Sequence, residues 1–542
     1  MFKKLFATKF TSITSAAVVI AAAGLLSRIL GIVRDRILAG QFGAGNELDI
    51  YYAAFRVPDL VYNLIVLGAL SAGFIPVFIG LLKNEESPLY KTNELAWNLV
   101  NNILNILALF LFGACLILAV LSPWLVPLIT PGFSGDKLQL TINLTRLMFF
   151  SPILLGLSGV FGGVLQSFRR FLIFSLAPVM YNLGIIFGAL FLVDRYNIYG
   201  LAFGVILGAG LHLLIQIPTV FRLGFGYRLI LNFKDSHFVK IIKMMGPRIL
   251  GLASGQFNLI IITVLASTLA AGSLAIFNLA NNLQSFAIGI FGVSYAIAVF
   301  PALSKSFAGK DEQNFCSSFQ RTFKQILFFV IPCSILFIIL RAQIVRIILG
   351  SGKFDWNDTV LTANSLGLFC LSLFAQSLLP LLARAFYARH NTKIPFYAAF
   401  LCLLVNVFLS WWLIQKIGVL GLALGFSISS IFNLVLLVVW LKLRIPNIWR
   451  NGIIVALAKI SFASLLMGVA VQYTKTWLGL SVDMQKFWGV FMQGLIATIV
   501  GIAVFVLVGY LLQTEELLNF VAGLKKKLFK SVEVEEGIRE AG

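Results

Sequence analysis

Apolar stretches long enough to cross a lipid bilayer recur from one end of this 542-residue chain to the other. A transmembrane α-helix needs roughly 20 predominantly apolar residues, so the sequence predicts an all-α polytopic membrane protein with about 14 transmembrane helices. The stretch 93–130 is too long for one straight span and is expected to include interfacial helix. The expected spans are residues 12–36, 48–82, 93–130, 140–167, 172–193, 198–221, 240–268, 272–304, 322–350, 360–388, 394–415, 418–442, 452–473 and 487–512.

The charge pattern fits a membrane chain. Only 12% of the residues are charged, whereas a soluble globular domain has about 25%. In a soluble protein the net charge of +21 would suggest a nucleic-acid partner. Here the simpler interpretation is that Lys and Arg keep the cytoplasmic loops inside, so no nucleic acid is expected. Most Lys and Arg fall in segments that are cytoplasmic when the N-terminus is inside, which predicts an even number of spans and cytoplasmic N- and C-termini.

Three short motifs recur in the same order at nearly one spacing, with shifts of 220, 221 and 221 residues. They are SRILG (27–31) with PRILG (247–251), PGF (131–133) with SGKF (351–354), and YGLAFG (199–204) with LGLALG (420–425). This repeat predicts two six-helix lobes in parallel orientation plus two C-terminal helices, a layout typical of transporters with a cavity between the lobes. The expected domains are an N-terminal lobe at 1–230, a C-terminal lobe at 231–445, two extra spans at 446–512 and a basic cytoplasmic tail at 513–542.

The stretch SRILGIVRDRILAGQFGAG, at 27–45, places charges at the edge of the first span. On one helix, Arg28 and Asp35 share a face and Arg34 neighbours it. In the second span, Arg56 lies beside Pro58, which kinks a helix and frees a backbone carbonyl. A guanidinium binds phosphate bidentately and stays charged. We therefore expect Arg28, Arg34 and Arg56 to converge on an anion.

Each of these charges also has a structural explanation. Arg36, and to a lesser degree Arg34, could extend toward the outer surface with an apolar stem in lipid. Asp49 lies in the first turn of the second span, where it would favour the helix dipole. Arg56 and Asp59 are three residues apart and could pair across the kink.

Other polar residues in the spans either line a cavity or join helices through hydrogen bonds. These are Arg146, Gln166, Asn182, Arg248, Gln256, Asn258, Asn281, Asn282, Arg384 and Arg389. The sequence has no nucleotide-binding loop, catalytic dyad or metal-ligand cluster, and its five cysteines are scattered, so no cofactor and no metal are expected. These absences argue against an ATP-driven pump or a hydrolase.

The opening stretch, continued as NELDIYYAAFRVPDL and then GALSAGFIPVF, resembles the N-terminal signature of MurJ-type (MviN) lipid II flippases. This family belongs to the multidrug/oligosaccharidyl-lipid/polysaccharide exporter superfamily. GIFGVSYAIAVFPALSKS at 289–306 is similar to the family's eighth span, and RAFYARHNTKIP at 384–395 to its tenth-to-eleventh span junction. The resemblance covers the first twelve spans.

The resemblance implies a flippase rather than an enzyme, in the bacterial cytoplasmic membrane. It would move an undecaprenyl-diphosphate-linked peptidoglycan precursor from the inner to the outer leaflet by alternating access. A cationic cavity would take the head group, and a groove at the two extra spans would take the lipid tail. Membrane lipids and the peptidoglycan synthesis machinery are the implied partners, and coupling to the membrane potential or a monovalent cation is left open. The site residues carried over by motif position are Ser27, Arg28, Arg34, Asp35, Asp49 and Arg56, with Asp59, Asn258 and Asn282 as weaker cavity candidates.

Four positions depart from the family pattern, which usually has charged residues where this chain has Tyr62, Leu67, Ile262 and Asn282. The departures keep three alternatives open. One is a flippase for another polyprenyl-diphosphate-linked oligosaccharide. The others are a small-molecule antiporter of the same superfamily and a membrane scaffold for envelope assembly.

Overall fold

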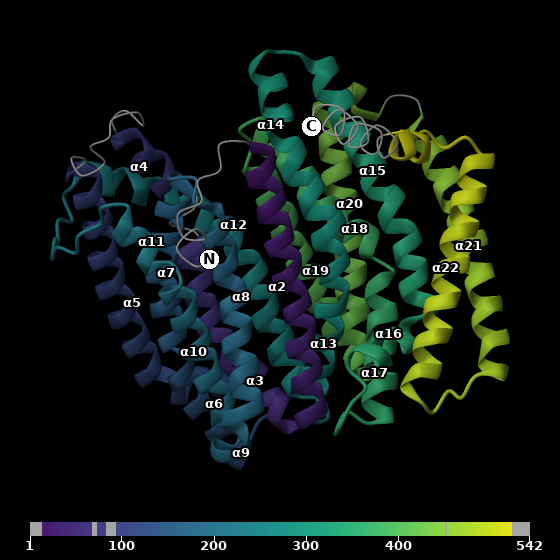
Figure 1. The fold of residues 1–542 in the computed structure, drawn as a ribbon, viewed down its shortest axis with the longest axis horizontal. Helices are drawn as coiled ribbons and strands as arrows, with labels where there is room; N and C mark the ends of the chain where they lie inside the picture. The colour runs from purple at the N-terminus through teal and green to yellow at the C-terminus, as the bar shows by residue number, and fades with distance from the viewer. Residues whose placement is uncertain (1–12, 68–72, 83–93, 450–451, 523–542) are drawn as a thin grey trace, which may run out of the picture. The chain divides into compact units, whose positions relative to one another are not determined.

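The computed structural model describes residues 13–67, 73–82, 94–449 and 452–522 (Figure 1). Every regular element in this part of the chain is a helix, which confirms the all-α class. The α-helices are α2 (Ile13–Phe42), α3 (Asn46–Val61), α4 (Ile75–Leu81), α5 (Glu94–Ile129), α6 (Gly135–Met148), α7 (Phe150–Ser167), α8 (Phe171–Phe187), α9 (Val193–Tyr196), α10 (Tyr199–Leu214), α11 (Ile217–Arg222), α12 (Ser236–Ser267), α13 (Ser273–Ala287), α14 (Ser294–Ala308), α15 (Glu312–Ile339), α16 (Arg341–Ile348), α17 (Trp356–Cys370), α18 (Leu373–Ala388), α19 (Lys393–Ile417), α20 (Val419–Arg444), α21 (Ile453–Ser481) and α22 (Phe487–Leu511). Short π-helical or 3-10 segments are η1 (Tyr62–Leu67), η4 (Gly188–Leu192), η5 (Ile288–Val293) and η6 (Pro446–Trp449).

Ten helical segments of the described residues are long and apolar enough to cross a membrane. The pair α17 and α18, bent by 48°, makes an eleventh if it counts as one span. The three other expected spans coincide with α2, with α3 to α4, and with α12, and each of these carries charged residues. The polytopic architecture is therefore confirmed, and the remaining spans of the expected 14 stay predictions.

Contacts divide the chain into two compact units. Among the described residues, unit 1 falls within Met1–Leu279, Ile348–Asp358 and Ser410–Leu422, and unit 2 within Ala280–Ile347, Thr359–Leu409 and Ala423–Gly542. This division does not follow the expected boundary between residues 230 and 231, because α12 packs against α5, α3 and η1. The expected lobes, extra spans and tail stay predictions.

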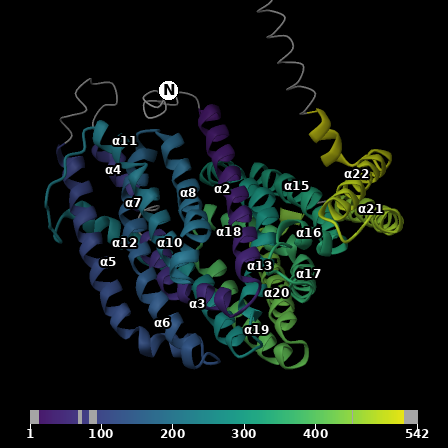
Figure 2. The same ribbon diagram turned by 60° about the horizontal axis from the view of Figure 1, so that its bottom comes forward.

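Glycines let two helices of unit 1 approach closely. Gly184 of α8 faces Gly208 of α10, and Gly188 of η4 faces Gly204 of α10, and a Cβ on any of these four would collide with neighbouring backbone. Small residues at helix contacts are typical of membrane proteins, since they bring backbones together for dispersion contacts. The first helix, α2, packs along α8, as both views show (Figure 1 and Figure 2).

The repeated motifs make matching contacts in unit 1. Gly200 of YGLAFG packs against the backbone of Leu192, and Gly421 of LGLALG packs against the backbone of Leu413. The two pairs are related by the same shift of 221 residues that relates the motifs. A repeat of sequence is thus accompanied by a repeat of helix packing.

The two short loop motifs also make reciprocal contacts. In the PGF loop, the N–H of Gly132 donates to Ser267 Oγ at 3.3 Å, at the end of α12. In the SGKF loop, the N–H of Lys353 donates to the carbonyl of Gly40 at 2.8 Å, near the end of α2. Because α2 carries SRILG and α12 carries PRILG, each loop meets the helix that begins the other repeat. These contacts support the internal repeat.

In unit 2, a chain of amides and hydroxyls joins α13, α18 and α20. Gln376 donates to Gln284 Oε1 at 3.0 Å and to Ser372 Oγ at 2.8 Å, and Ser372 donates to Ser427 Oγ at 3.0 Å. Leu373 and Leu378, which flank Gln376 on α18, belong to the hydrophobic core of the unit. Such buried hydrogen bonds satisfy polar groups that lipid cannot.

The ends of the chain are described only in part. The tail expected at 513–542 is described to residue 522. In this part, Lys324 Nζ of α15 lies 3.1 Å from Glu515 Oε2 and 3.6 Å from Glu516 Oε1. Residues 1–12 and the basic stretch after 522 lie outside the described residues.

The α8–α10 contact predicts opposite outcomes for two glycines of one helix. Gly208→Ala should destabilise the protein by about 1–3 kcal/mol, because the added methyl collides with the Tyr181 carbonyl. Gly210→Ala is the matched control. Its Cβ would meet no atom within 4 Å, so it should be neutral or stabilising by up to about 1 kcal/mol. Thermal unfolding in detergent measures both, and equal midpoints for the two variants would contradict the packing.

Candidate functional site

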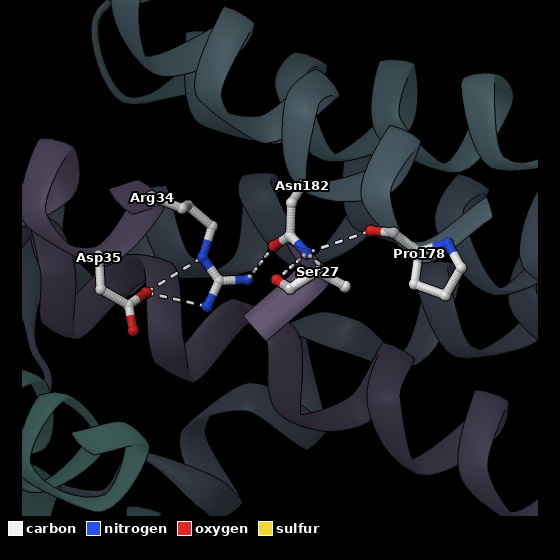
Figure 3. A network of polar contacts seen from close by, with 5 residues as sticks. All are labelled: Ser27, Arg34, Asp35, Pro178 and Asn182. Carbon is white, nitrogen blue, oxygen red and sulfur yellow. Dashed lines mark hydrogen bonds and ion pairs between the residues drawn. The ribbon is translucent and has the colours of Figure 1, made fainter. Parts of the chain in front are cut away.

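Arg34 of α2 lies at the centre of a polar network (Figure 3). Its Nε and Nη2 donate to Asp35 Oδ1 at 3.0 and 2.9 Å, and its Nη1 donates to Asn182 Oδ1 at 3.2 Å. Asn182 Nδ2 in turn donates to the hydroxyl and the carbonyl of Ser27, both at 3.3 Å, and to the Pro178 carbonyl at 3.1 Å. The guanidinium is therefore held in one orientation, with Asp35 as its counter-ion.

Helix geometry explains why these side chains meet. Ser27 and Arg34 are seven residues apart, two turns of α2, so they share the face that packs on α8. Asn182 projects from α8 between them. Of the expected site residues, Ser27, Arg34 and Asp35 are thus brought together.

Arg56 of α3 is held differently, in a buried position with 8% of its surface exposed. Its Nε donates to Thr263 Oγ1 of α12 at 2.8 Å, and its Nη2 donates to Asn278 Oδ1 of α13 at 2.7 Å. Within the described residues, no carboxylate lies within 4.0 Å of its charged nitrogens, so the alternative of a close pair with Asp59 does not form. Arg56 is a buried cation whose close partners are neutral oxygens.

Asp59 is an acidic residue near both arginines. Its half-buried carboxylate interacts electrostatically with both Arg56 and Arg34. The phenols of Tyr51 and Tyr181 are also within electrostatic range of this carboxylate. Arg34 of α2, Arg56 of α3 and Tyr181 of α8 are therefore within electrostatic range of Asp59, and sequence reasoning did not single out the tyrosines.

The backbone next to Asp59 is irregular. Pro58 lies inside α3, and the chain passes into the π-helix η1 at Tyr62. Asn63 Nδ2 donates to the Asp59 carbonyl at 2.9 Å, which satisfies an acceptor near the break. The α-helix continues through Pro58, so the expected kink at the proline stays a prediction, and the irregular turn begins four residues later. Such π-helical turns often mark functional sites.

Asp49 caps another helix. Its Oδ2 accepts from Lys137 Nζ at 3.0 Å and from the Gly272 N–H at 2.8 Å, while its Oδ1 accepts from the Ala275 N–H at 3.0 Å. With 2% of its surface exposed, the carboxylate is engaged at the start of α13. This geometry favours a structural role, at the N-terminus of α13 rather than of its own helix.

The remaining expected residues differ in exposure. Arg28 is exposed on α2, and Asn258 of α12 and Asn282 of α13 are partly buried. Arg36 Nη1 donates to the Ile348 carbonyl at 3.1 Å. At the positions that depart from the family pattern, Ile262 is fully buried and Tyr62 is half-buried, while the side chain of Leu67 lies outside the described part.

Three partners were not expected from the sequence: Thr263, Asn278 and Lys137. Thr263 and Asn278 also donate to carbonyls four residues earlier in their own helices, a common arrangement that gives no functional signal. Among the described residues, no group of three His, Cys, Asp or Glu side chains could hold a metal ion.

The fold defines a class, that of polytopic α-helical membrane proteins, and solved structures from the multidrug/oligosaccharidyl-lipid/polysaccharide exporter superfamily share it. A multidrug resistance MATE family transporter of this superfamily, in an inward-facing conformation, shares the fold with a TM-score of 0.65 at 13% identity, covering 80% of this chain and 99% of that one. The sequence model of the family Lipid II flippase MurJ matches residues 38–492. The chain belongs to this MurJ family.

Two further comparisons agree. The probable lipid II flippase MurJ of Buchnera aphidicola subsp. Acyrthosiphon pisum is 31% identical over 417 residues, 76% of this chain and 80% of the relative. A structure of lipid II flippase MurJ in an inward closed conformation matches with a TM-score of 0.76 at 25% identity, over 91% of this chain and 98% of that one. Together with the apolar helices, these relatives indicate a multi-pass inner-membrane protein of a transport family.

The capping role of Asp49 predicts a large loss of stability on its removal. Asp49→Ala leaves two buried N–H groups and Lys137 without their acceptor, and should lower the free energy of unfolding by about 3 kcal/mol. Glu47→Ala removes an exposed acid from the same turn and should change it by less than about 0.5 kcal/mol. Chemical unfolding of both variants in detergent tests this, and similar midpoints would mean that Asp49 is not a structural cap.

Proposed function

We propose that this chain translocates lipid II, the lipid-linked peptidoglycan precursor, from the inner to the outer leaflet for cell-wall synthesis. The observation that carries the proposal is Arg56, a buried cation with neutral hydrogen-bond partners and no carboxylate within 4.0 Å in the described chain. A buried charge without a close counter-ion is costly, and an anionic ligand removes that cost. Family membership supports the choice of a diphosphate-linked lipid as this anion.

The geometry suggests how the diphosphate is held. Thr263 and Asn278 accept from Nε and Nη2 of Arg56, which orients the guanidinium and leaves its Nη1 for a phosphate oxygen. Arg34 brings a second guanidinium, held in place by Asp35 and Asn182. Asp59 offsets part of both charges when no diphosphate is present. Two oriented cations on different helices suit two linked phosphates.

An apolar groove in unit 2 suits the lipid tail. It lies between α15 and α21, has a volume of about 670 Å³ and is lined by Ile335, Ile339, Leu465, Val469 and Trp477, among others. In the proposed cycle the tail stays in lipid along this groove while the head group crosses the protein by alternating access. The protein performs no covalent chemistry, and both termini are cytoplasmic. Contact with the peptidoglycan synthesis machinery is also part of the proposal.

Tyr62 and Asn282 replace residues that are usually charged in the family, so the proposal is best tested by measuring which lipid-linked cargo the protein prefers. Arg34→Ala and Arg56→Ala should each weaken lipid II binding by at least roughly 30-fold, the cost of removing one partner from a buried charge contact. Transport in reconstituted vesicles should be lost in both at a temperature at which thermal unfolding shows that both variants remain folded. Native mass spectrometry with lipid II beside other undecaprenyl-diphosphate sugars measures binding and preference together.

Arg36→Ala is the matched control, because Arg36 donates to a backbone carbonyl and should leave lipid II binding within roughly twofold. Preference for another lipid-linked sugar would assign a different cargo to the same site. Wild-type transport by Arg34→Ala and Arg56→Ala would refute the assignment of the site, and no lipid-diphosphate binding by the wild type would favour an antiporter or a scaffold.

We further propose that the membrane potential, rather than a cofactor, favours outward movement. An anionic head group moves outward down an inside-negative potential, and each charge gains about 2.3 kcal/mol per 100 mV. Movement of the head group from the inner to the outer leaflet of reconstituted vesicles should therefore rise when an inside-negative potassium diffusion potential is imposed at equal sodium and pH. A rate that ignores the potential and follows a sodium or proton gradient would replace this proposal with cation coupling.

A further inference from the structure

A segment between α11 and α12 is fastened to α5 by three asparagines. Asn101 donates to the Gly226 carbonyl and accepts from the Arg228 N–H, both at 2.9 Å. Asn105 donates to the carbonyls of residues 228 and 230, at 2.9 and 3.1 Å. Asn102 donates to the carbonyl of residue 232 at 2.9 Å and accepts from its N–H at 2.7 Å. The three amides hold the backbone of residues 226–232 along the first turns of α5 (Figures 1 and 2).

The exposed apolar residues of α5 show the level at which this segment lies. Apart from Leu95, the large ones run from Leu109 to Leu128. These 20 positions span roughly 30 Å at 1.5 Å per residue, the thickness of the hydrocarbon core. Asn105 and Asn101 lie roughly 6 and 12 Å beyond Leu109 along the helix. The fastened segment is therefore at the level of the lipid head groups.

The segment presents apolar side chains outward at alternate positions. Tyr227, Leu229, Leu231 and Phe233 are exposed by 58, 76, 48 and 57%. The residues between them are those whose backbone groups bind the asparagines. Exposed aromatic and leucine side chains at the head-group level insert among the upper parts of acyl chains.

Positive charge adjoins this apolar row. Lys234, Lys240 and Lys243 line an open pocket of about 560 Å³, together with Ser236, Val239 and Met244. Lys240 and Lys243 follow Ser236 by four and seven residues, so the three share one face of α12. Two acids of the described residues lie in or against this segment. Asp235 caps α12 by accepting from the Phe238 N–H at 2.8 Å, and its carboxylate is 3.8 Å from His237 Nδ1. Glu94 accepts from Arg228 Nη1 at 2.6 Å and so engages the charge of Arg228 rather than the lysines.

From these observations we infer that residues 226–244 form a binding site for an anionic phospholipid. Its phosphate lies in the pocket of Lys234, Lys240 and Lys243, and the apolar side chains from Tyr227 to Phe233 contact its acyl chains. A lipid is favoured over a soluble anion or a protein, because the apolar row lies at the head-group level and the lysines continue from it. This site is separate from Arg34 and Arg56, and the inference does not depend on the transport proposal.

The test uses the full chain in a neutral detergent, titrated with phosphatidylglycerol or with phosphatidylcholine of the same acyl chains. Native mass spectrometry counts bound lipid. The wild type should prefer phosphatidylglycerol, and Lys240→Gln/Lys243→Gln should weaken that binding by roughly 25-fold, about fivefold per lysine near an anionic surface. Lys305→Gln/Lys310→Gln, which removes two exposed lysines elsewhere, should leave it unchanged.

A second variant isolates the apolar row. Leu229→Ser/Leu231→Ser keeps every lysine and every fastening asparagine, and should weaken binding of long-chain phosphatidylglycerol several-fold. Equal binding of the two phospholipids, an equal loss in the control pair, or inorganic phosphate competing at the lipid's own concentration would each overturn the inference. Because the substituted side chains are exposed, unchanged thermal midpoints are expected and confirm that the variants are folded.

Discussion

The organisation of unit 1 depends on the cost of keeping a charge away from water. Arg56 lies in a span of an otherwise apolar chain, where an unsatisfied guanidinium would be prohibitive. Two of its donor groups, Nε and Nη2, bond Thr263 and Asn278, which come from α12 and α13, more than 200 residues later. Because of these hydrogen bonds, the second predicted span contacts α12 and α13, the first helices of the second repeat. These contacts also leave a positive charge that neutral partners orient without cancelling.

The surrounding contacts make that arrangement rigid. Asp49 satisfies the first N–H groups of α13 and so fixes the helix that supplies Asn278. Glycine contacts bring α10 close to α8, which supplies Asn182 to Arg34. A site built on helices and held by hydrogen bonds and close packing presents its cations with little loss of side-chain entropy on binding. A few polar side chains also fix the backbone at the membrane surface, where three asparagines of α5 hold the extended segment 226–232 in place.

Sequence reasoning located the charges better than their partners. The charged residues of the first two spans were recognisable because charges are rare in apolar runs, and Arg34, Asp35 and Ser27 do meet. Asn182 was one of several amides with no ranking among them. Thr263 gave no signal, since a threonine in a helix ordinarily bonds its own preceding turn, as this one also does. The apolar stretch 93–130 was expected to include interfacial helix. It forms one continuous helix, α5, and the first turns of that helix hold the segment 226–232.

The sequence by itself determined the helical class, most of the spans and the residues that carry charge, because each follows from local composition and from the energy of transferring side chains into lipid. It also determined the internal repeat, which is a comparison of the chain with itself. Only the tertiary structure decided that Arg56 has neutral partners, that Asp49 caps a distant helix and that Asp59 lies within range of two arginines. Those outcomes depend on which helices pack together, and helix packing in lipid is set by small residues and a few hydrogen bonds rather than by hydrophobic periodicity.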